Sequence, residues 1–179
     1  MLKTDESAFV LIDVQGKLAN LMYKKERLFQ NLQILTAGVR ELGLPIIWAE
    51  QYPEGLGPTI PELREILSDD SPLPKKTFSV CGNPDLMQKI EHSGRREIIV
   101  AGIETHVCVY QTVADLIEKG FSVTIVADAI SSRTKNNKRI GLRKMLELGA
   151  RISSVEMLLF ELMQTAEHEK FKVISKLVK

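Results

Sequence analysis

Cysteine and histidine are scarce in this sequence. The 179 residues include two cysteines, Cys81 and Cys108, which are too few for the disulfide framework of a small secreted protein. The three histidines, His92, His106 and His168, are scattered without the spacing of metal ligands. We therefore expect no disulfide scaffold, no bound metal and no other cofactor.

A charge excess and long apolar runs are also absent. Lysine and arginine number 24 against 23 aspartates and glutamates, so no overall field draws nucleic acid or an anionic membrane. No apolar run approaches the roughly 20 residues that cross a bilayer, and the polar start lacks a secretory pattern. The basic C-terminal tail, with four lysines from Lys170 to Lys179, is interpreted as a solvated end. We expect a soluble cytoplasmic protein without nucleic-acid or membrane partners.

Short apolar runs alternate with helical patterns along the whole chain. The strands are expected at 9–12, 45–49, 97–101, 121–126 and 151–152, with an irregular or extended segment at 72–80. The helices are expected at 27–42, 62–67, 84–92, 106–119, 136–148 and 155–165. Apolar strands alternating with helices predict an α/β fold: a three-layer α/β/α sandwich with a mainly parallel central sheet. The length suits a single domain over 1–179.

Asp13 directly follows the first expected strand, in the segment FVLIDVQ. In parallel sheets, ligands bind beyond the carboxyl ends of the strands, so this position is a candidate for chemistry. Burial there disfavours the charged carboxylate unless a cation lies nearby. A turn or helix cap is the alternative interpretation, and the residues alone leave both open.

Cys108 lies in the segment GIETHVCV, just past the expected strand at 97–101. A thiol in the first turn of the next helix is near the positive end of the helix dipole, which favours the reactive thiolate. The backbone N–H groups of that turn can also receive an oxyanion. A buried structural cysteine fits the position equally well. Cys81 has no comparable setting and is interpreted as inert core filler.

Two lysines, Lys75 and Lys76, precede an aromatic segment that contains Phe78. One of them turned toward Asp13 would balance the carboxylate and support negative charge on sulfur. A solvated charge is the ordinary alternative for each lysine. Spacing alone does not choose between the two.

Together these segments resemble the isochorismatase-like cysteine hydrolases, a superfamily that also contains nicotinamidases. The resemblance extends from LIDVQ to ISSVE at 152–156, and its most specific stretch is VAGIETHVCVYQTVADL at 100–116. It implies the isochorismatase-like, Rossmann-like fold and a catalytic triad of Asp13, Lys75 and Cys108. Lys75 is selected because the family lysine stands three residues before an aromatic that is followed by serine. The DAISSR segment at 128–133 also matches and is interpreted as turn and capping chemistry.

The resemblance further implies a cis peptide between Ile103 and Glu104. That geometry would aim the backbone N–H groups of Glu104 and Cys108 at an oxyanion. The Glu104 side chain is expected to point away from the thiol, into an ion pair, because a nearby carboxylate would raise the pKa of the thiol. His106 is interpreted mainly as a polar cap, because positions two apart on a helix face different directions.

The sequence also departs from its relatives. The region of the nicotinamidase metal motif reads WAEQYP and contains no histidine, which removes most support for nicotinamide as substrate. Isochorismatases proper hydrolyse a vinyl ether and typically lack the cysteine, so Cys108 favours acyl chemistry. The EQYPEGLGP loop resembles the isochorismatase domain-containing branch.

We therefore expect a metal-independent hydrolase that cleaves an amide, carbamoyl or related C–N bond of a small carbonyl substrate through a thioester on Cys108. The alternatives are a non-catalytic binding or assembly module and a vinyl ether hydrolase. Homo-oligomers are expected, with the apolar positions of the last helix as a candidate surface (Val155, Leu158, Leu159 and Leu162). The candidate pocket-lining residues, with core packing as the alternative for the aromatic ones, are Gln15, Gln51, Tyr52, Phe78 and Tyr110.

Overall fold

Six parallel strands form one central sheet in the computed structural model, which describes residues 1–179. The strand order is β3-β2-β1-β4-β5-β6, and every neighbouring pair is parallel. This confirms the predicted α/β fold with a mainly parallel sheet. The strands are β1 (Ser7–Ile12), β2 (Ile46–Gln51), β3 (Leu73–Lys75), β4 (Glu97–Ile103), β5 (Ser122–Ser131) and β6 (Arg151–Ser153).

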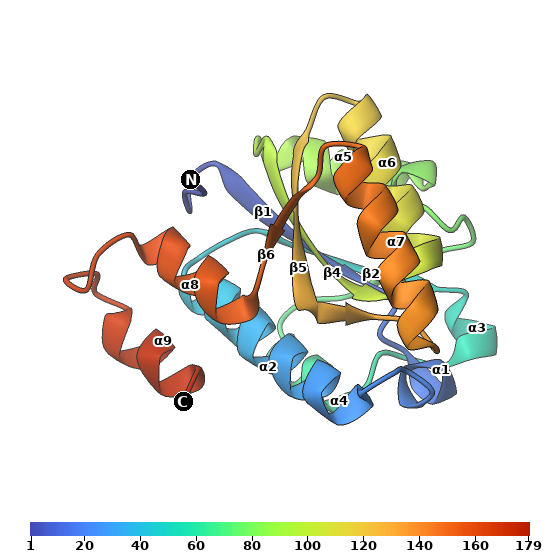
Figure 1. Cartoon of the computed structure of the whole chain (residues 1–179), viewed down its shortest axis with the longest axis horizontal. Helices are drawn as coiled ribbons and strands as arrows, with labels where there is room; N and C mark the ends of the chain where they lie inside the picture. The colour runs from blue at the N-terminus through green and yellow to red at the C-terminus, as the bar shows by residue number, and fades with distance from the viewer.

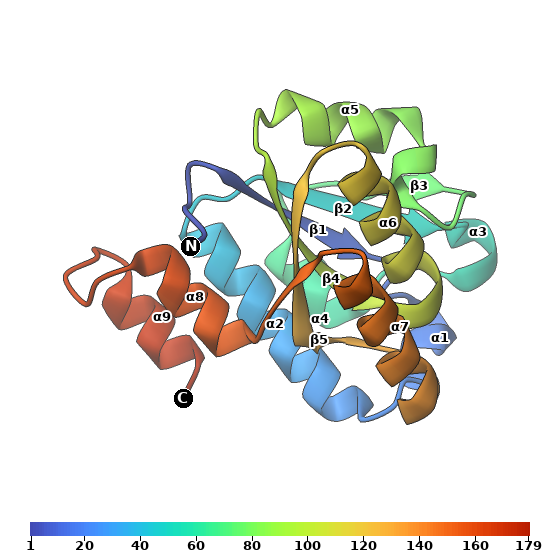
Figure 2. The ribbon, with the colours of Figure 1, turned by 45° about the horizontal axis from the view of Figure 1, so that its top comes forward.

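Helices cover both faces of the sheet (Figure 1). The segments α2, α4, α8 and α9 lie on one face, α5, α6 and α7 lie on the other, and the short α1 and α3 lie beyond the carboxyl ends of the strands (Figures 1 and 2). None of the helices combines the length and apolarity needed to cross a membrane. The bounds are α1 (Gly16–Asn20), α2 (Lys25–Glu41), α3 (Pro53–Leu56), α4 (Pro61–Ile66), η1 (Val80–Gly82), α5 (Pro84–His92), η2 (Thr105–Val109), α6 (Tyr110–Glu118), α7 (Lys135–Glu147), α8 (Val155–Met163) and α9 (Phe171–Leu177).

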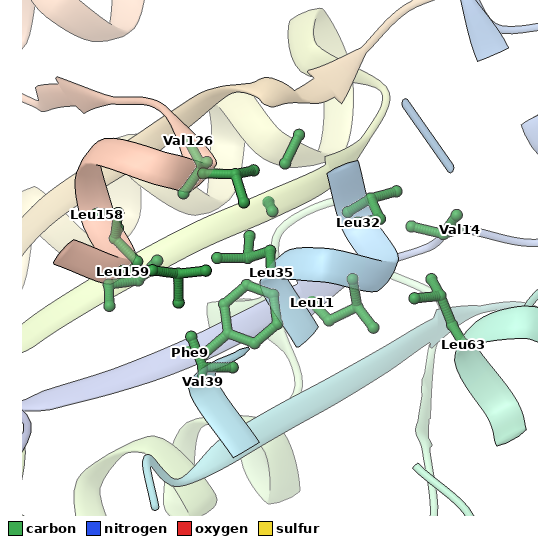
Figure 3. Close-up of a cluster of buried hydrophobic side chains, with 14 of the residues drawn as sticks. Phe9, Leu11, Val14, Leu32, Leu35, Val39, Leu63, Val126, Leu158 and Leu159 are labelled. Atoms are coloured by element: carbon green, nitrogen blue, oxygen red, sulfur yellow. The ribbon is translucent and has the colours of Figure 1, made fainter. Parts of the chain in front are cut away.

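Strand β1 is buried along its whole length because both of its faces are covered. Phe9 and Leu11 belong to the core under α2, whereas Val10 and Ile12 belong to the core on the other face. Figure 3 shows Phe9 and Leu11 packed against the apolar stripe of α2. Each such side chain contributes about 1.5–3 kcal/mol when fully buried, so this strand anchors both layers.

The proposed oligomer surface on the last long helix is wrong. Val155, Leu158, Leu159 and Leu162 are all buried in the core between α8 and α2, and Leu158 and Leu159 appear there in Figure 3. Their spacing of three and four marks a face that packs inward onto this same chain. The opposite side of α8 instead exposes Met157 and Phe160.

Three boundaries differ from the sequence expectation. The expected helix at 106–119 begins with a π-helical turn, η2, before α6 starts at Tyr110. Strand β5 continues through Ser131, well beyond the predicted strand. The tail interpreted as a solvated end contains α9, whose Ile174 is buried against the core, so the apolar positions outweighed the lysines around them.

Candidate active site

Asp13 lies at the carboxyl end of β1, where the chain leaves the sheet. Its φ of 54° is in the left-handed region, which aspartate tolerates better than most residues. The Asp13 N–H still donates to the carbonyl of Ala49 on β2 (3.1 Å), and the Asp13 carbonyl accepts from the N–H of Gln15 (2.8 Å). The backbone is thus held on both sides while the side chain, 2% exposed, is directed into the interior.

Lys75 is the last residue of β3, and its side chain is completely buried. Its Nζ donates to Asp13 Oδ2 (2.8 Å) and also to the carbonyls of Thr77 (3.2 Å) and Phe78 (3.0 Å). The neighbouring Lys76 is exposed. The structure therefore places Lys75, and not Lys76, beside the carboxylate.

Two glutamines organise the same corner of the sheet. Gln51 Oε1 accepts from Lys75 Nζ (2.7 Å), and its Nε2 donates to the carbonyl of Lys76 (2.9 Å). Gln15 is fully buried and uses its amide on the backbone of Gln51 and Gly57. Gln51 therefore touches the ionic pair directly, whereas Gln15 fixes the loop that carries it.

Cys108 lies in η2, directly after β4, and is 7% exposed. Two glycines allow this segment to pack closely against β1 and α7. A Cβ on Gly102 (φ 125°) would collide with the carbonyl of Ile12 on β1. A Cβ on Gly141 of α7 would lie 2.8 Å from the carbonyl oxygen of Thr105. The segment that carries Cys108 is thus held between the sheet and α7.

The thiol and the carboxyl alter each other's titration. Burial, and after it the negative charge of Asp13, raise the pKa of Cys108 to about 12. Burial likewise raises the pKa of Asp13, opposed by the charge and the hydrogen bond of Lys75 and by the nearby thiol of Cys108. Burial and the neighbouring carboxylate therefore outweigh the helix dipole, which by itself favours the thiolate. At neutral pH the proton resides on sulfur.

One oxygen of Asp13 is left free by the ion pair. Oδ2 accepts from Lys75, whereas the buried Oδ1 has no hydrogen-bond partner within normal geometry. Because the thiol of Cys108 lies close enough to affect the pKa of this carboxyl, Oδ1 is the acceptor available to its proton.

The backbone and the side chain of Glu104 have different roles. The Ile103–Glu104 peptide is cis, and the Glu104 N–H donates no hydrogen bond within the protein. The carboxylate points away from the sulfur and accepts from the backbone N–H and Nε of Arg133, both at 3.1 Å. This agrees with the expected ion pair.

His106 is fixed between two neighbours on other elements. Its Nδ1 lies 3.0 Å from Ser132 Oγ, and its Nε2 lies 3.3 Å from Asn137 Nδ2. Because an amide nitrogen donates, Nε2 is the acceptor and Nδ1 carries the proton toward Ser132. His106 therefore ties η2 to α7, in keeping with its interpretation as a polar structural residue.

The candidate aromatic residues lie at different places around the site. Tyr52 and Phe78 are largely exposed, and the Phe78 carbonyl binds Lys75. Tyr110 begins α6, and its ring stacks under the ammonium of Lys144 at 5.2 Å. A cavity of about 370 Å³ lies beside β3 and is lined by Tyr52 and the Lys75 segment.

Sequence reasoning missed Glu50, a buried acid one residue before Gln51. Its Oε1 accepts from the N–H (2.6 Å) and the hydroxyl (2.7 Å) of Thr59, which in turn accepts from the indole N–H of Trp48 (2.9 Å). The charge of Glu50 also raises the pKa of Asp13. The available signal was a carboxylate in an otherwise apolar strand.

The arrangement combines a protonated thiol, a carboxylate with a free oxygen, and a buried ammonium. No group of three or more His, Cys, Asp or Glu side chains is close enough to hold a metal ion. A thiol next to a base, with the base oriented by a third group, is the general pattern of nucleophilic catalysis.

Comparisons with known proteins agree with the fold. A model of the isochorismatase domain matches residues 7–157. The chain is 36% identical over 179 residues to isochorismatase family protein 1B of Dictyostelium discoideum, covering 98% of this chain and 87% of that protein. It is 35% identical to isochorismatase domain-containing protein 2 of Bos taurus, covering 97% and 83%. A solved structure described as the MAR1 ribonuclease of Caenorhabditis elegans superposes with a TM-score of 0.93 at 34% identity, covering 99% and 91%. The protein thus belongs to the isochorismatase family, in which the sequence resemblance had placed it.

Proposed function

We propose that residues 1–179 form one hydrolase domain that cleaves a C–N bond of a small amide or carbamoyl substrate through a thioester on Cys108, without a metal. The observation that carries this proposal is the buried Lys75–Asp13 pair at 2.8 Å, which leaves Asp13 Oδ1 free beside the thiol. A structural ion pair alone would not need a thiol close enough to influence the pKa of its carboxyl.

In the first stage, Asp13 takes the thiol proton as sulfur attacks the carbonyl carbon. The tetrahedral intermediate then collapses, the C–N bond breaks, and the amine leaves with the proton from Asp13. In the second stage Asp13 takes a proton from water, which attacks the thioester. Sulfur departs as the leaving group and recovers the proton, which restores the resting enzyme.

Lys75 holds the carboxylate and balances negative charge as the proton moves. Its buried ammonium makes four hydrogen bonds, of which the bond to Asp13 Oδ2 fixes the carboxylate plane. When the thiol proton passes to Asp13, the negative charge moves onto sulfur and remains near the ammonium. The charge of Lys75 lowers the pKa of the thiol as well as that of Asp13, so negative charge is compensated by the same ammonium before and after the transfer.

The backbone N–H groups of Glu104 and Cys108 form the proposed oxyanion hole. The Glu104 N–H is free of other acceptors, which supports this role. A preorganised donor of this kind contributes about 3–4 kcal/mol to transition-state stabilisation in measured hydrolases. The donors act only as charge develops on the carbonyl oxygen.

The decisive experiment is a mass-spectrometric search for an acyl adduct. The purified chain is incubated with a library of amides, carbamoyl compounds and esters. Peptide mapping then shows whether the acyl group is attached to Cys108 or to Cys81. We expect acylation of Cys108 alone, turnover that disappears in Cys108→Ala, and unchanged turnover in Cys81→Ala. A Cys108→Ala variant with full activity on a true substrate contradicts the mechanism.

A non-catalytic binding module is the rival, because a buried, protonated thiol also suits a silent site. Alkylation of the resting thiol does not separate the two, since both have the proton on sulfur. Acylation does separate them, because only the enzyme couples proton transfer to attack. Absence of any adduct across the library, with saturable binding of a library member, favours the binding module.

We also propose that copies of this chain associate through exposed apolar residues of β6 and α8. Ile152, Met157 and Phe160 are 49%, 61% and 37% exposed on this side of the molecule. Met157→Glu is expected to shift the sedimentation mass toward the monomer, whereas Glu156→Gln on the same helix leaves it unchanged.

The small-molecule substrate is the other proposed partner. The free thiols suit a reducing compartment such as the cytoplasm.

A further inference from the structure

A second cavity, of about 420 Å³, lies away from the triad between the first turn of α2 and one face of α7. The end of β5 separates these two helix starts in Figures 1 and 2. None of Asp13, Lys75 and Cys108 lines this cavity. Its basic lining residues are Lys24, Arg27, Lys135, Lys138 and Arg139.

These five cations have no anionic partners within the protein. None of them takes part in any of the salt bridges of the chain. Arg139 donates only to the neutral side chain of Asn136, and Lys24 lies 5.6 Å from the ring centre of Tyr23. The single acid of the lining, Asp128, uses Oδ1 to accept the N–H of Val155 at the start of α8. The cavity thus gathers excess positive charge in a chain whose net charge is only +1.

Lys138 shows that the charges act on one another. It is half-buried, and burial lowers its pKa, with further lowering by the charges of Arg27 and Lys24 and opposition from Asp128. Like charges brought together at a partly buried place disfavour the folded chain unless an anion joins them. Lys138 alone of the five cations is half-buried, whereas the other four are exposed.

The rest of the lining is apolar apart from Asp128, Ser131 and Ser154. Leu28, Ile130 and Leu142 line the same cavity as the cations. The α7 residues of the lining are spaced at three and four, so one face of the helix presents both the cations and Leu142. A ligand here meets positive charge together with an apolar surface.

We propose that this cavity binds a small organic molecule carrying at least two phosphate groups, of the chemical class of a nucleoside diphosphate. Five cations match a multiply charged head, and the apolar residues accommodate the organic part. The volume lies in the range of small-molecule sites. Basic residues grouped around one cavity, without a basic stripe over the surface, favour a small ligand over RNA.

The test is calorimetric titration of the full chain with ADP, pyrophosphate and inorganic phosphate. We expect one ADP site per chain, tighter than the pyrophosphate site, with phosphate weakest. Arg27→Gln combined with Lys138→Gln is expected to weaken ADP binding by at least about tenfold, because each change removes a charge-assisted contact. Lys144→Gln, on the same helix but outside the cavity, is the matched control and should stay within about twofold of the unmodified protein.

Thermal unfolding separates binding from damage to the fold. Without anion, the double variant should unfold at the same or a higher temperature than the unmodified chain, because it relieves repulsion. With ADP present, only the unmodified chain and Lys144→Gln should gain stability, since a ligand stabilises the state that binds it. A double variant that unfolds earlier without anion contradicts the argument from charge crowding.

Several results overturn the proposal. Absence of saturable ADP binding excludes the site, and equal ADP affinity in the double variant places binding elsewhere. If pyrophosphate binds as tightly as ADP, the cavity does not recognise the organic part of the ligand, and the proposal of a nucleoside diphosphate is wrong. Binding of a short RNA, lost in the double variant while ADP fails to bind, assigns the cations to nucleic acid. A change of sedimentation mass in the double variant, again without ADP binding, assigns them to a second copy of the chain.

Discussion

Two lysines of this chain show how differently the fold treats a positive charge. Lys75 is completely buried, yet its ammonium has four acceptors, including the carboxylate of Asp13. Lys138 is only half-buried, yet it has no ion-pair partner and faces other cations. The protein itself neutralises the charge of Lys75, whereas we propose that a bound anion neutralises the charge of Lys138. A buried charge without internal partners therefore points to a missing ligand, and one with partners points to a site built for a reaction.

The largest effect is expected for the base of the completed site. Asp13→Asn removes the proton acceptor, so kcat/KM on the substrate found by the acylation screen should fall by roughly 10³–10⁴-fold, which corresponds to about 4–5.5 kcal/mol. Asp70→Asn, at an exposed loop acid, is the control and should leave the rate unchanged. A comparable rate in Asp13→Asn would remove the base from the mechanism.

The second effect tests the two lysines directly by urea unfolding. Lys75→Met leaves the buried carboxylate of Asp13 without its cation, which should lower the free energy of unfolding by about 3–5 kcal/mol. Lys138→Met removes a charge from a repulsive group, so it should change that free energy by no more than about 0.5 kcal/mol, or raise it. Combining Lys75→Met with Asp13→Asn should recover much of the loss. Equal destabilisation by both single changes would erase the contrast between the two sites.

The positions of Asp13 and Cys108 could be predicted from the sequence because each follows an apolar run that forms a parallel strand. Lys75 could not be separated from Lys76 by the residues alone. Strand β3 is only three residues long, and its register against β2, which pairs Lys75 with Gln51, decides which lysine turns inward. The family resemblance supplied that choice before the structure did.

The protonation of Cys108 was beyond the sequence for a different reason. The helix dipole can be inferred from a pattern, but the burial of the sulfur depends on packing between β4, α6 and α7. The second cavity was hidden in the same way. Its cations come from α2 and α7, which are far apart in the sequence and meet only because β5 lies between them (Figure 1).

A smaller effect is expected where α7 touches the nucleophile segment. Gly141→Ala would push a methyl group to 2.8 Å from the carbonyl oxygen of Thr105 and 2.9 Å from the backbone nitrogen of His106. Because both are backbone atoms, η2 must shift, at a cost of about 1–3 kcal/mol in unfolding free energy. We also expect slower acylation of Cys108, with ADP binding at the second cavity preserved. If Gly141→Ala changes neither the unfolding free energy nor the rate of Cys108 acylation, η2 can move to accommodate the methyl group without cost.

The smallest effect concerns the pKa of Cys108 and is read from stability at high pH. The thiol has a pKa of about 12 in the folded chain against 9.0 as its ordinary value, so between these values the unfolded chain loses a proton that the folded chain keeps. The stabilising contribution is fully present below pH 9 and is lost as the pH rises toward 12. At pH 10 the loss amounts to about 1.4 kcal/mol. Urea unfolding of the unmodified chain and of Cys108→Ala, each at pH 8 and pH 10, isolates this contribution, because all other groups titrate in both. The unmodified chain should lose about 1.4 kcal/mol more than the variant; an equal loss would mean that burial and the charge of Asp13 do not raise the pKa of this thiol above its ordinary value.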